Sequence, residues 1–272
     1  MIVLTWGDLL ARRPPFDLPV RLTIGVFDGV HVGHRRLFSE ITGAGAGTLS
    51  LVMTFPKSPV VVHSPDAFPG SILTYRQKME RIDGLGVQAA VVIDFSEEMS
   101  NLSGEAFVRL LRENLTIQRI VVGQNFRFGK KRTSGTEDLR EMLSDTGIEV
   151  LVTEPVLRGG SMVSSSRIRF AIRSGDLVEA SEMLAACHAI DLRAIEKRVS
   201  AGKVRIPRKD ISQVLPPDGE YPVALEGPAG TRPGTCTVGR NALTLAAPGW
   251  DAATRDKNAA TPAAYVGLIV FT

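Results

Sequence analysis

The stretch of residues 24–38, IGVFDGVHVGHRRLF, places two histidines, His31 and His34, three positions apart where a predicted strand meets a predicted helix. The first amides of a helix have no partner within the helix and carry the positive end of its dipole, so this junction favours a phosphate group. The imidazoles can donate further hydrogen bonds, and Gly33 leaves room beside the backbone for a phosphate or a flat ring. A solvated turn or a helix cap is the simpler explanation of either histidine alone, but the joint pattern favours a phosphate site.

A second candidate phosphate site is the stretch of residues 163–184, VSSSRIRFAIRSGDLVEASEML. Three consecutive serines, residues 164–166, precede a helical run and suit its N-terminus, where hydroxyl oxygens accept hydrogen bonds from unpaired amides. Arg167 and Arg169 lie in the first turn, where the helix dipole disfavours cations. A bound anion would remove this conflict, although an ordinary serine cap with solvated arginines fits the sequence equally well.

A third group of residues follows the apolar strand predicted at residues 119–123, RIVVG. Ligands of parallel sheets bind beyond the carboxyl ends of the strands. Asn125 offers both a donor and an acceptor, and Phe126 or Phe128 can pack on a flat ring. Packing in the protein core is the competing explanation of the two phenylalanines.

Alternating strands and amphipathic helices surround these residues and predict an α/β fold with a parallel sheet over roughly residues 18–185. The predicted strands are RLTIGVF, LSLVMTF, AAVVIDF, RIVVG and IEVLVTEP, and the predicted helices are HRRLFSEIT, TYRQKMERIDGLG, GEAFVRLLRENL and TEDLREMLSDTG. Beyond about residue 190, segments such as EYPVALEG and NALTLAAP lie between proline- and glycine-rich turns and predict a small antiparallel β domain. Residues 251–264 read as a mobile loop before a last strand in AAYVGLIVFT.

The composition argues against several classes of protein. The 32 lysines and arginines against 29 acidic residues leave a net charge of +3, which is too small to indicate a nucleic-acid surface. Cys187 and Cys236 lie far apart without a CxxC pair, which argues against a disulfide framework or a zinc site. The chain shows neither a secretory start nor eighteen consecutive apolar residues. We therefore expect a soluble, cytoplasmic protein with no nucleic-acid or membrane partner and an oligomeric state that the sequence leaves open.

Taken together, the three motifs resemble the bacterial FAD synthetases, the bifunctional riboflavin kinase and FMN adenylyltransferase family. GVFDGVHVGH, residues 25–34, resembles the first signature of the family with its HxGH pattern, and VVGQNFRFGKKRTSGT, residues 121–136, resembles the second. The serine-rich stretch of residues 163–184 resembles the third. The resemblance implies a Rossmann-like HxGH nucleotidyltransferase domain over residues 1–187 and a riboflavin-kinase-like, β-barrel-like domain over residues 188–272.

The resemblance also implies a reaction, the transfer of AMP from ATP to FMN, which gives FAD and pyrophosphate. Because the FMN phosphate is itself the nucleophile, catalysis reduces to aligning two anions and stabilising the charge on the phosphoryl oxygens. Mg²⁺ enters with ATP, and the sequence identifies no protein ligand for it. By this resemblance the catalytic residues are His31, His34 and Asn125; the ATP-binding residues are Gly25, Phe27, Asp28, Gly33, Ser164, Ser165, Ser166 and Arg169; and the flavin-binding residues are Phe55, Pro59, Asn125, Phe126 and Phe128.

The chain departs from the family pattern at several positions. Where the family usually reads Thr-Phe-Asp-Pro-His-Pro, residues 54–59 read Thr-Phe-Pro-Lys-Ser-Pro, so we expect altered flavin contacts. Asn125 stands where the family often has aspartate. Where the kinase domain carries Pro-Thr-Ala-Asn, residues 207–210 read Pro-Arg-Lys-Asp, and no glutamate follows Glu226 to serve as the kinase base. We therefore expect a degenerate kinase-like domain without riboflavin kinase activity.

Two other interpretations stay open. The altered residues 54–59 favour an enzyme of the same superfamily with another phosphate-bearing acceptor, such as nicotinamide mononucleotide or a pantetheine phosphate. The degenerate second domain favours a flavin- or nucleotide-binding protein without catalysis. The retained His31, His34 and serines 164–166 favour the FMN adenylyltransferase.

Overall fold

The structure is a computed structural model of the 272-residue chain, and it describes residues 1–11, 17–43, 45, 47–56, 68–94, 97–200, 202–228, 230–250 and 266–272. The chain forms two compact units. The first comprises Met1–Pro65 and Lys78–Val163, and the second comprises Asp66–Gln77 and Ser164–Thr272. These units differ in extent from the domains predicted at 1–187 and 188–272, and that domain division stays a prediction. The predicted loop of residues 251–264 lies outside the described residues.

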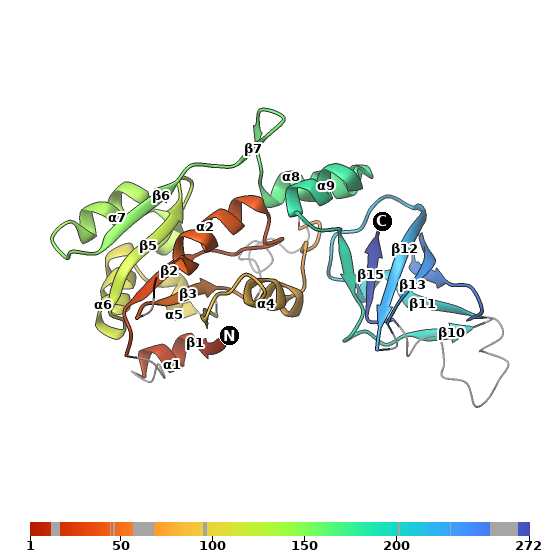
Figure 1. Cartoon of the computed structure of the whole chain (residues 1–272), viewed down its shortest axis with the longest axis horizontal. Coiled ribbons are helices and arrows are strands. Elements are labelled where there is room, and N and C mark those ends of the chain that lie inside the picture. Colours follow the sequence, from red (N-terminus) through yellow and green to blue (C-terminus); the bar gives the residue numbers. More distant parts are fainter. Residues whose placement is uncertain are drawn as a thin grey trace. The chain divides into compact units, whose positions relative to one another are not determined.

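A six-stranded parallel sheet forms the centre of the first unit (Figure 1). The strands lie in the order β1 (Ile2–Thr5), β4 (Ala89–Val92), β3 (Leu49–Thr54), β2 (Val20–Ile24), β5 (Ile117–Gly123) and β6 (Glu149–Thr153). Every adjacent pair is parallel. All six residues of β3 are buried, as expected for a sheet that is covered on both faces. The predicted α/β fold with a parallel sheet is confirmed.

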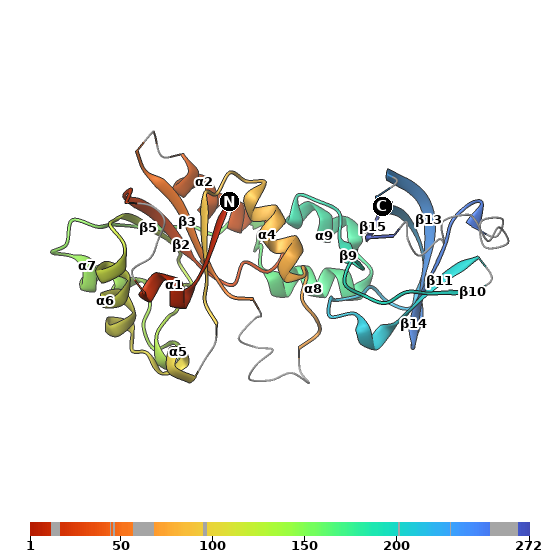
Figure 2. The ribbon, with the colours of Figure 1, turned by 90° about the horizontal axis from the view of Figure 1, so that it is seen from below.

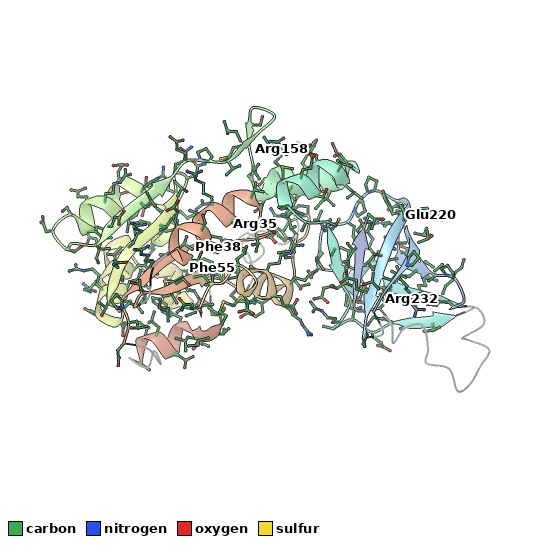
Figure 3. All side chains as sticks on the ribbon, in the orientation of Figure 1. Arg35, Phe38, Phe55, Arg158, Glu220 and Arg232 are labelled. Atoms are coloured by element: carbon green, nitrogen blue, oxygen red, sulfur yellow. The ribbon has the colours of Figure 1, made fainter. Side chains whose placement is uncertain are left out.

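Helices cover both faces of this sheet, and Figure 2 shows α2 and α1 on opposite sides of it. On one face, Leu22 of β2 and Leu51 of β3 share a buried cluster with Leu111 of α6 and Leu139 of α7. α2 packs across β2, β3 and β5 and buries Phe38, which Figure 3 labels. Right-handed crossovers explain the two layers, because connections that run in opposite directions along a sheet leave it on opposite faces. The helices of this unit are α1 (Trp6–Leu10), α2 (Val32–Thr42), α5 (Glu97–Asn101), α6 (Gly104–Asn114) and α7 (Thr136–Leu143), with the 3₁₀ turn η2 (Lys130–Arg132); α4 (Tyr75–Asp83) begins in the second unit and continues into the first.

Each strand and helix predicted for residues 18–160 is present, with small shifts at the ends. The sequence prediction missed β1 and α1, because elements of four or five residues are too short to show a period. Thr5 starts α1 as an N-cap, and its Oγ1 accepts a hydrogen bond from the amide of Asp8 at 3.1 Å. Parallel pairing with β4 then adds β1 to the edge of the sheet.

The second unit contains a seven-stranded antiparallel sheet, which confirms the predicted β domain. Its core gathers alternate strand residues such as Leu225, Leu245 and Ile269 around the buried Trp250. The helices α8 (Ser165–Ser174) and α9 (Leu177–Leu184) pack against each other in this unit. The strands lie in the order β10 (Arg198–Ser200), β11 (Lys203–Pro207), β14 (Ala242–Ala246), β13 (Gly230–Val238), β12 (Gly219–Gly227), β15 (Leu268–Phe271) and β9 (Ala189–Asp191), with η3 (Arg208–Asp210) after β11.

The described part of the chain shows three further features that bear on function. Cys187 is exposed and Cys236 is buried, and the two are not joined in a disulfide. Within the described ranges, no three histidine, cysteine, aspartate or glutamate side chains are grouped so that they could hold a metal ion. Nor does any helix in that part of the chain have the length and apolar character needed to cross a bilayer.

Gly234 on β13 provides a test of the packing in the second unit. A Cβ at this position would lie 2.6 Å from Cδ1 of Leu225 and 2.7 Å from the carbonyl oxygen of Ala246, a backbone atom that cannot move aside alone. We expect Gly234→Ala to lower the free energy of unfolding by about 1–3 kcal/mol, the usual cost of overpacking, as measured by urea denaturation. Gly45→Ala is the control, because a Cβ there meets no atom within 4 Å. An unchanged midpoint for Gly234→Ala would show that the sheet accommodates the methyl group.

Candidate functional site

The candidate site lies where the parallel sheet reverses its strand order, between β2 and β5. β3 and β4 follow β2 on one side, whereas β6 follows β5 on the other, so the connections after β2 and β5 diverge. Ligands of open parallel sheets bind at the carboxyl ends of the strands at such a point. Two cavities occur there, which we call the histidine cavity, of about 230 Å³, and the aromatic cavity, of about 190 Å³. Ile24, Gly25 and Phe126 line both, so the two cavities adjoin.

The histidine cavity brings together side chains from the connection after β2 and from the connection after β5. The predicted site residues that line it are Gly25, Phe27, His31, Gly33, His34, Asn125 and Phe126. The sequence analysis missed Val156, Met162 and Val163, which also line it. Met162 ends the hairpin of β7 (Leu157–Arg158) and β8 (Ser161–Met162), and Val156 and Val163 flank this hairpin. Nδ2 of Asn125 contacts Sδ of Met162 at 3.5 Å. Val156, Met162 and Val163 follow β6 at the carboxyl edge of the sheet, and this position could have identified them as site residues from the sequence.

The two histidines form one stacked unit at the start of α2. His31 is the N-cap of the helix, and its Nδ1 accepts a hydrogen bond from the amide of His34 at 3.3 Å. The ring centroids lie 3.5 Å apart with an interplanar angle of 20°, and the Phe27 ring meets His34 edge-on at 5.1 Å. Because Nδ1 of His31 is an acceptor, the proton of the neutral ring is on Nε2. The helix-cap explanation of His31 therefore holds, and the remaining donor of His31 is still available to a ligand.

Burial keeps both imidazoles neutral at neutral pH. It lowers the pKa of His31 to about 4. It also lowers the pKa of His34 well below its usual value, with smaller contributions from the charges of His31 and Lys78. In the described structure, the buried Nδ1 of His34 has no hydrogen-bond partner. Such an unsatisfied buried nitrogen is costly in a folded protein and is frequent at functional sites.

The backbone of the connection after β2 adopts unusual conformations. Phe27 has φ 52° and Val30 has φ 46°, and both are buried side chains in the left-handed region. Each such residue costs on the order of 1–3 kcal/mol and persists only where its surroundings hold it. The amide of Val30 closes the turn on the carbonyl of Phe27 at 3.2 Å. A strained, well-held loop of this kind is typical of ligand sites.

The glycines of this stretch serve packing between neighbouring side chains. A Cβ on Gly25 would lie 2.9 Å from the Phe27 ring, and one on Gly33 would lie 3.2 Å from the His31 ring. We expected Gly33 to leave room for a ligand. In this structure, the space beside Gly33 is occupied by the His31 ring. Asp28 is also buried, and its charge raises the pKa of Lys78. Its predicted contact with ATP stays a prediction.

The aromatic cavity lies beside the histidine cavity and has the character of a ring-binding pocket. Phe126 and Phe128 stack with centroids 5.3 Å apart and an interplanar angle of 15°, and Phe55 joins them in the lining. The sequence analysis missed Met99 and Phe107, which also line this cavity. The two phenylalanines serve both as core residues and as a cavity wall. Phe128 is buried and Phe126 is half-buried against the same core, and both line the aromatic cavity. Pro59, which was predicted to bind flavin, lies outside the described residues.

The predicted phosphate residues of the third motif belong to the second unit. Ser164 is the N-cap of α8, and its side chain accepts a hydrogen bond from the amide of Arg167 at 3.3 Å. Arg167 is paired with Glu179 of α9, so that cation is balanced within the unit. Nε of Arg169 donates to the carbonyl of Gly70 at 2.9 Å. Ser165 and Ser166 form the first turn of the helix.

Comparisons with known proteins agree with this geometry. A family model described as FAD synthetase matches residues 15–167. A bifunctional riboflavin kinase/FMN adenylyltransferase of Escherichia coli (strain K12) is 28% identical over 212 residues, which are 76% of this chain and 68% of that protein. A protein of the same description from Bacillus subtilis (strain 168) is 29% identical over 229 residues, 80% of this chain and 71% of that protein. A crystal structure described as a macrolide-efflux protein from Streptococcus pneumoniae has the same fold, with a TM-score of 0.79 over 100% of this chain and 98% of that chain at 23% identity.

The buried histidines predict a pH dependence of stability. Because the pKa of His31 falls from 6.5 to about 4 on folding, the unfolded chain binds protons more readily in that window, and stability is lost as the pH falls from 6.5 towards 4. The loss is at most about 1.4 kcal/mol per pH unit for each imidazole. His31→Asn keeps a capping oxygen. We expect this variant to lose less free energy of unfolding than the wild type between about pH 7 and about pH 5, as measured by urea denaturation at both pH values. Equal losses in both proteins would mean that His31 titrates normally.

Proposed function

Because the chain belongs to the FAD synthetase family, we propose that its first unit transfers AMP from ATP to FMN and releases pyrophosphate. The chain is a nucleotidyltransferase, and the proposal concerns which cavity takes which part of each substrate. The observation that carries it is the pair of adjoining cavities that share Gly25 and Phe126. One presents a helix N-terminus and imidazole donors, which suit phosphates, and the other presents aromatic rings, which suit a flavin. FAD contains both groups joined through a diphosphate.

In the proposed reaction, an oxygen of the FMN phosphate attacks the α-phosphorus of ATP. A phosphorus–oxygen bond forms to FMN while the bond from the α-phosphorus to the pyrophosphate oxygen breaks, and pyrophosphate leaves with the electron pair. The attacking oxygen is already ionised at neutral pH, so the protein supplies no base. What the protein supplies is alignment of two anions and donors for the charge that spreads over the phosphoryl oxygens.

We assign donation to those oxygens to the stacked histidines. The Nε2–H of His31 is the donor left after its Nδ1 has capped α2, and His34 adds a second ring beside it. The neutral state of both rings supports this role, because the cavity holds donors without the cost of buried positive charge. Asn125, on the opposite wall, offers an amide donor and a carbonyl acceptor to the same substrates. The backbone shape set by Gly25, Phe27 and Gly33 completes the proposed α-phosphate site.

The distal phosphates of ATP are assigned to the start of α8. Ser164, Ser165 and Ser166 supply hydroxyls and helix amides there, and Arg169 supplies a cation that the carbonyl of Gly70 holds in place. Mg²⁺ is proposed to enter with ATP, with the phosphates and water as its main ligands, because the described part of the chain groups no three ligand side chains. Bound to ATP, Mg²⁺ neutralises phosphate charge.

The flavin ring is assigned to the aromatic cavity. Phe55, Phe126 and Phe128 present apolar rings, and Met99 adds a polarisable side chain that adapts to a flat ligand. Ile24, Gly25 and Phe126 form the wall shared with the histidine cavity. The ring of FMN in this cavity would leave its phosphate directed towards the histidines. Both substrates favour the predicted cytoplasmic location.

We also propose that the second unit lacks riboflavin kinase activity. Arg208 occupies the place where the kinase family carries a metal-binding threonine, and its guanidinium donates to Asp218 at 2.7 Å and to the carbonyl of Gly239 at 3.1 Å. A guanidinium cannot coordinate Mg²⁺, and this one is held as part of the turn. The antiparallel sheet is retained while the chemistry of the turn is different.

One assay tests both proposals. The protein is incubated with ATP and Mg²⁺, once with FMN and once with riboflavin, and the flavins are separated by chromatography. We expect FAD from FMN and neither FMN nor FAD from riboflavin. FMN or FAD formed from riboflavin would contradict the loss of the kinase. No FAD from FMN would contradict the adenylyltransferase, and parallel incubations with nicotinamide mononucleotide and pantetheine phosphate would then identify another acceptor.

The histidine assignment is tested by His31→Ala and His34→Ala. Because each removes a donor to the transition state, we expect kcat for FAD formation to fall by about tenfold to a thousandfold. Arg109→Ala on the exposed face of α6 is the matched control, because its side chain is 69% exposed and lies outside both cavities. Undiminished turnover in either histidine variant, with an unchanged melting temperature, would remove that residue from the mechanism.

A further inference from the structure

Lys78 is a buried lysine that sequence reasoning did not single out. It lies on α4, its side chain is 5% exposed, and it belongs to the first unit. Its Nζ donates to the carbonyl oxygens of Val26 at 3.1 Å and Phe55 at 2.5 Å, and to Oγ1 of Thr54 at 3.3 Å. An ammonium group has three N–H donors, so these three oxygens can use all of them. Lysines are rarely buried unless such partners hold them.

The three acceptors lie where the strands β2 and β3 end. A backbone hydrogen bond joins these strand ends, from the amide of Gly25 to the carbonyl of Met53 at 3.0 Å. Just beyond it, Oγ1 of Thr54 donates to the carbonyl of Val26 at 3.2 Å, and Lys78 contacts both atoms. The ammonium therefore continues the join between the two strands after the sheet pairing has stopped.

Two further cations hold the same connection. Nη1 of Arg81, one turn after Lys78 on α4, donates to the carbonyl of Gly29 at 3.3 Å. Nε of Arg35 on α2, labelled in Figure 3, donates to the carbonyl of Val30 at 3.4 Å. Three carbonyls of the strained residues 26–30 thus face positive side chains. Of the three cations, Lys78 is the one that also holds the end of β3.

From this geometry we propose that Lys78 is a positioning residue for adenylyl transfer, which fixes the carbonyls of Val26 and Phe55 and so sets the spacing between the two cavities. Val26 and Phe55 both line the aromatic cavity, and Phe27, next to Val26, lines the histidine cavity. A shift at either carbonyl would change the distance between the phosphate of one substrate and the α-phosphorus of the other. The expected effect of Lys78 on the reaction rate rests on the proposed function. Its role in holding the strand ends rests on the contacts alone.

The surroundings of the ammonium connect its role to pH. Burial lowers the pKa of Lys78 to about 8, against the opposing effect of Asp28. Loss of the proton leaves two N–H donors for three acceptors, so the amine can no longer donate to all three oxygens and holds the strand ends less firmly. The charged or titratable groups on the elements around Lys78 include Asp28 of the connection after β2, His34 and Arg35 of α2, and Arg81 of α4. His34 is neutral in this pH range, because burial lowers its pKa well below its usual value.

The effect of this titration on stability has the opposite sign to its effect on activity. Because the pKa of Lys78 in the folded protein is below its ordinary 10.5, the unfolded chain holds that proton more tightly between about pH 8 and 10.5. The contribution of Lys78 to the free energy of unfolding therefore rises with pH in that window. A loss of activity in the same window cannot come from unfolding driven by Lys78.

The first test is Lys78→Met, with the kinetics of FAD formation measured across pH. Misplaced reactants lose rate steeply, so we expect kcat/KM to fall by about tenfold to a hundredfold. We also expect the wild-type loss of activity near pH 8 to be absent from this variant. Leu143→Ala is the matched control, because it destabilises the same unit from the buried side of α7 at a residue that lines neither cavity. Wild-type kinetics in Lys78→Met, or an unchanged alkaline limb, would overturn the proposal.

A milder variant keeps the proposal testable if Lys78→Met does not fold. Thr54→Val removes one acceptor of the ammonium and keeps the shape of the side chain. Because hydrogen bonds to the charged form raise the pKa of a lysine, we expect the alkaline limb of the pH profile to move to lower pH. A limb that stays in place would show that the ammonium does not depend on this contact.

A measurement without substrates separates this inference from the proposed function. Amide hydrogen exchange of residues 25–30, Thr54 and Phe55 should be faster in Lys78→Met than in wild type, and unchanged there in Leu143→Ala. Equal exchange in Lys78→Met and wild type would overturn the positioning role even in an active enzyme. If the wild type forms no FAD, the proposed function fails, and the exchange result still decides whether Lys78 holds the strand ends.

Discussion

The connection between β2 and α2 is the constraint on which the rest of the first unit depends. The sheet reverses its order at β2, so this connection must leave the sheet, turn sharply and start a helix at the edge of both cavities. It does so with Phe27 and Val30 in the left-handed region, a conformation that non-glycine residues reach at a cost of about 1–3 kcal/mol each. Both side chains are buried, and Lys78, Arg81 and Arg35 bind the carbonyls of the loop. Packing and charge together hold the backbone in this conformation, which it would leave without those contacts.

The electrostatics of the site follow from this arrangement. The loop turns its carbonyls towards cations, while α2 presents its N-terminal end and the neutral histidines to the cavity. The positive charges of Lys78, Arg81 and Arg35 face carbonyl oxygens of the loop, and the charge of Asp28 also acts on Lys78. A cavity built in this way offers donors to an anion without carrying an uncompensated charge of its own. The same burial that keeps the histidines neutral makes the unit sensitive to acid.

In the second unit, the fold and the proposed loss of kinase chemistry concern different residues. Its antiparallel sheet and core are complete, with Trp250 fully enclosed and Gln213 joining residues 68–77 to the sheet through the carbonyl oxygens of Ile72 and Ala189. A sheet of this kind depends on alternating apolar residues, which tolerate changes in the turns between strands. The turn after β11 carries Arg208, whose ion pair with Asp218 stabilises the turn and provides no metal ligand. A retained core is therefore weak evidence for a retained activity.

The sequence by itself determined the parallel α/β sheet, the later antiparallel sheet, the helix that follows the first motif and the motifs that carry the family resemblance. These properties are local, because periodicity, capping and motif spacing are read within a few residues. Only the tertiary structure decided that His31 caps its own helix while stacking on His34, and that Lys78 holds two strand ends. Lys78 reaches acceptors 52 and 23 residues away, and burial, which depends on every neighbouring element, sets its charge and those of the histidines. Contacts across such separations leave no period in the chain, so they are visible only once the fold has formed.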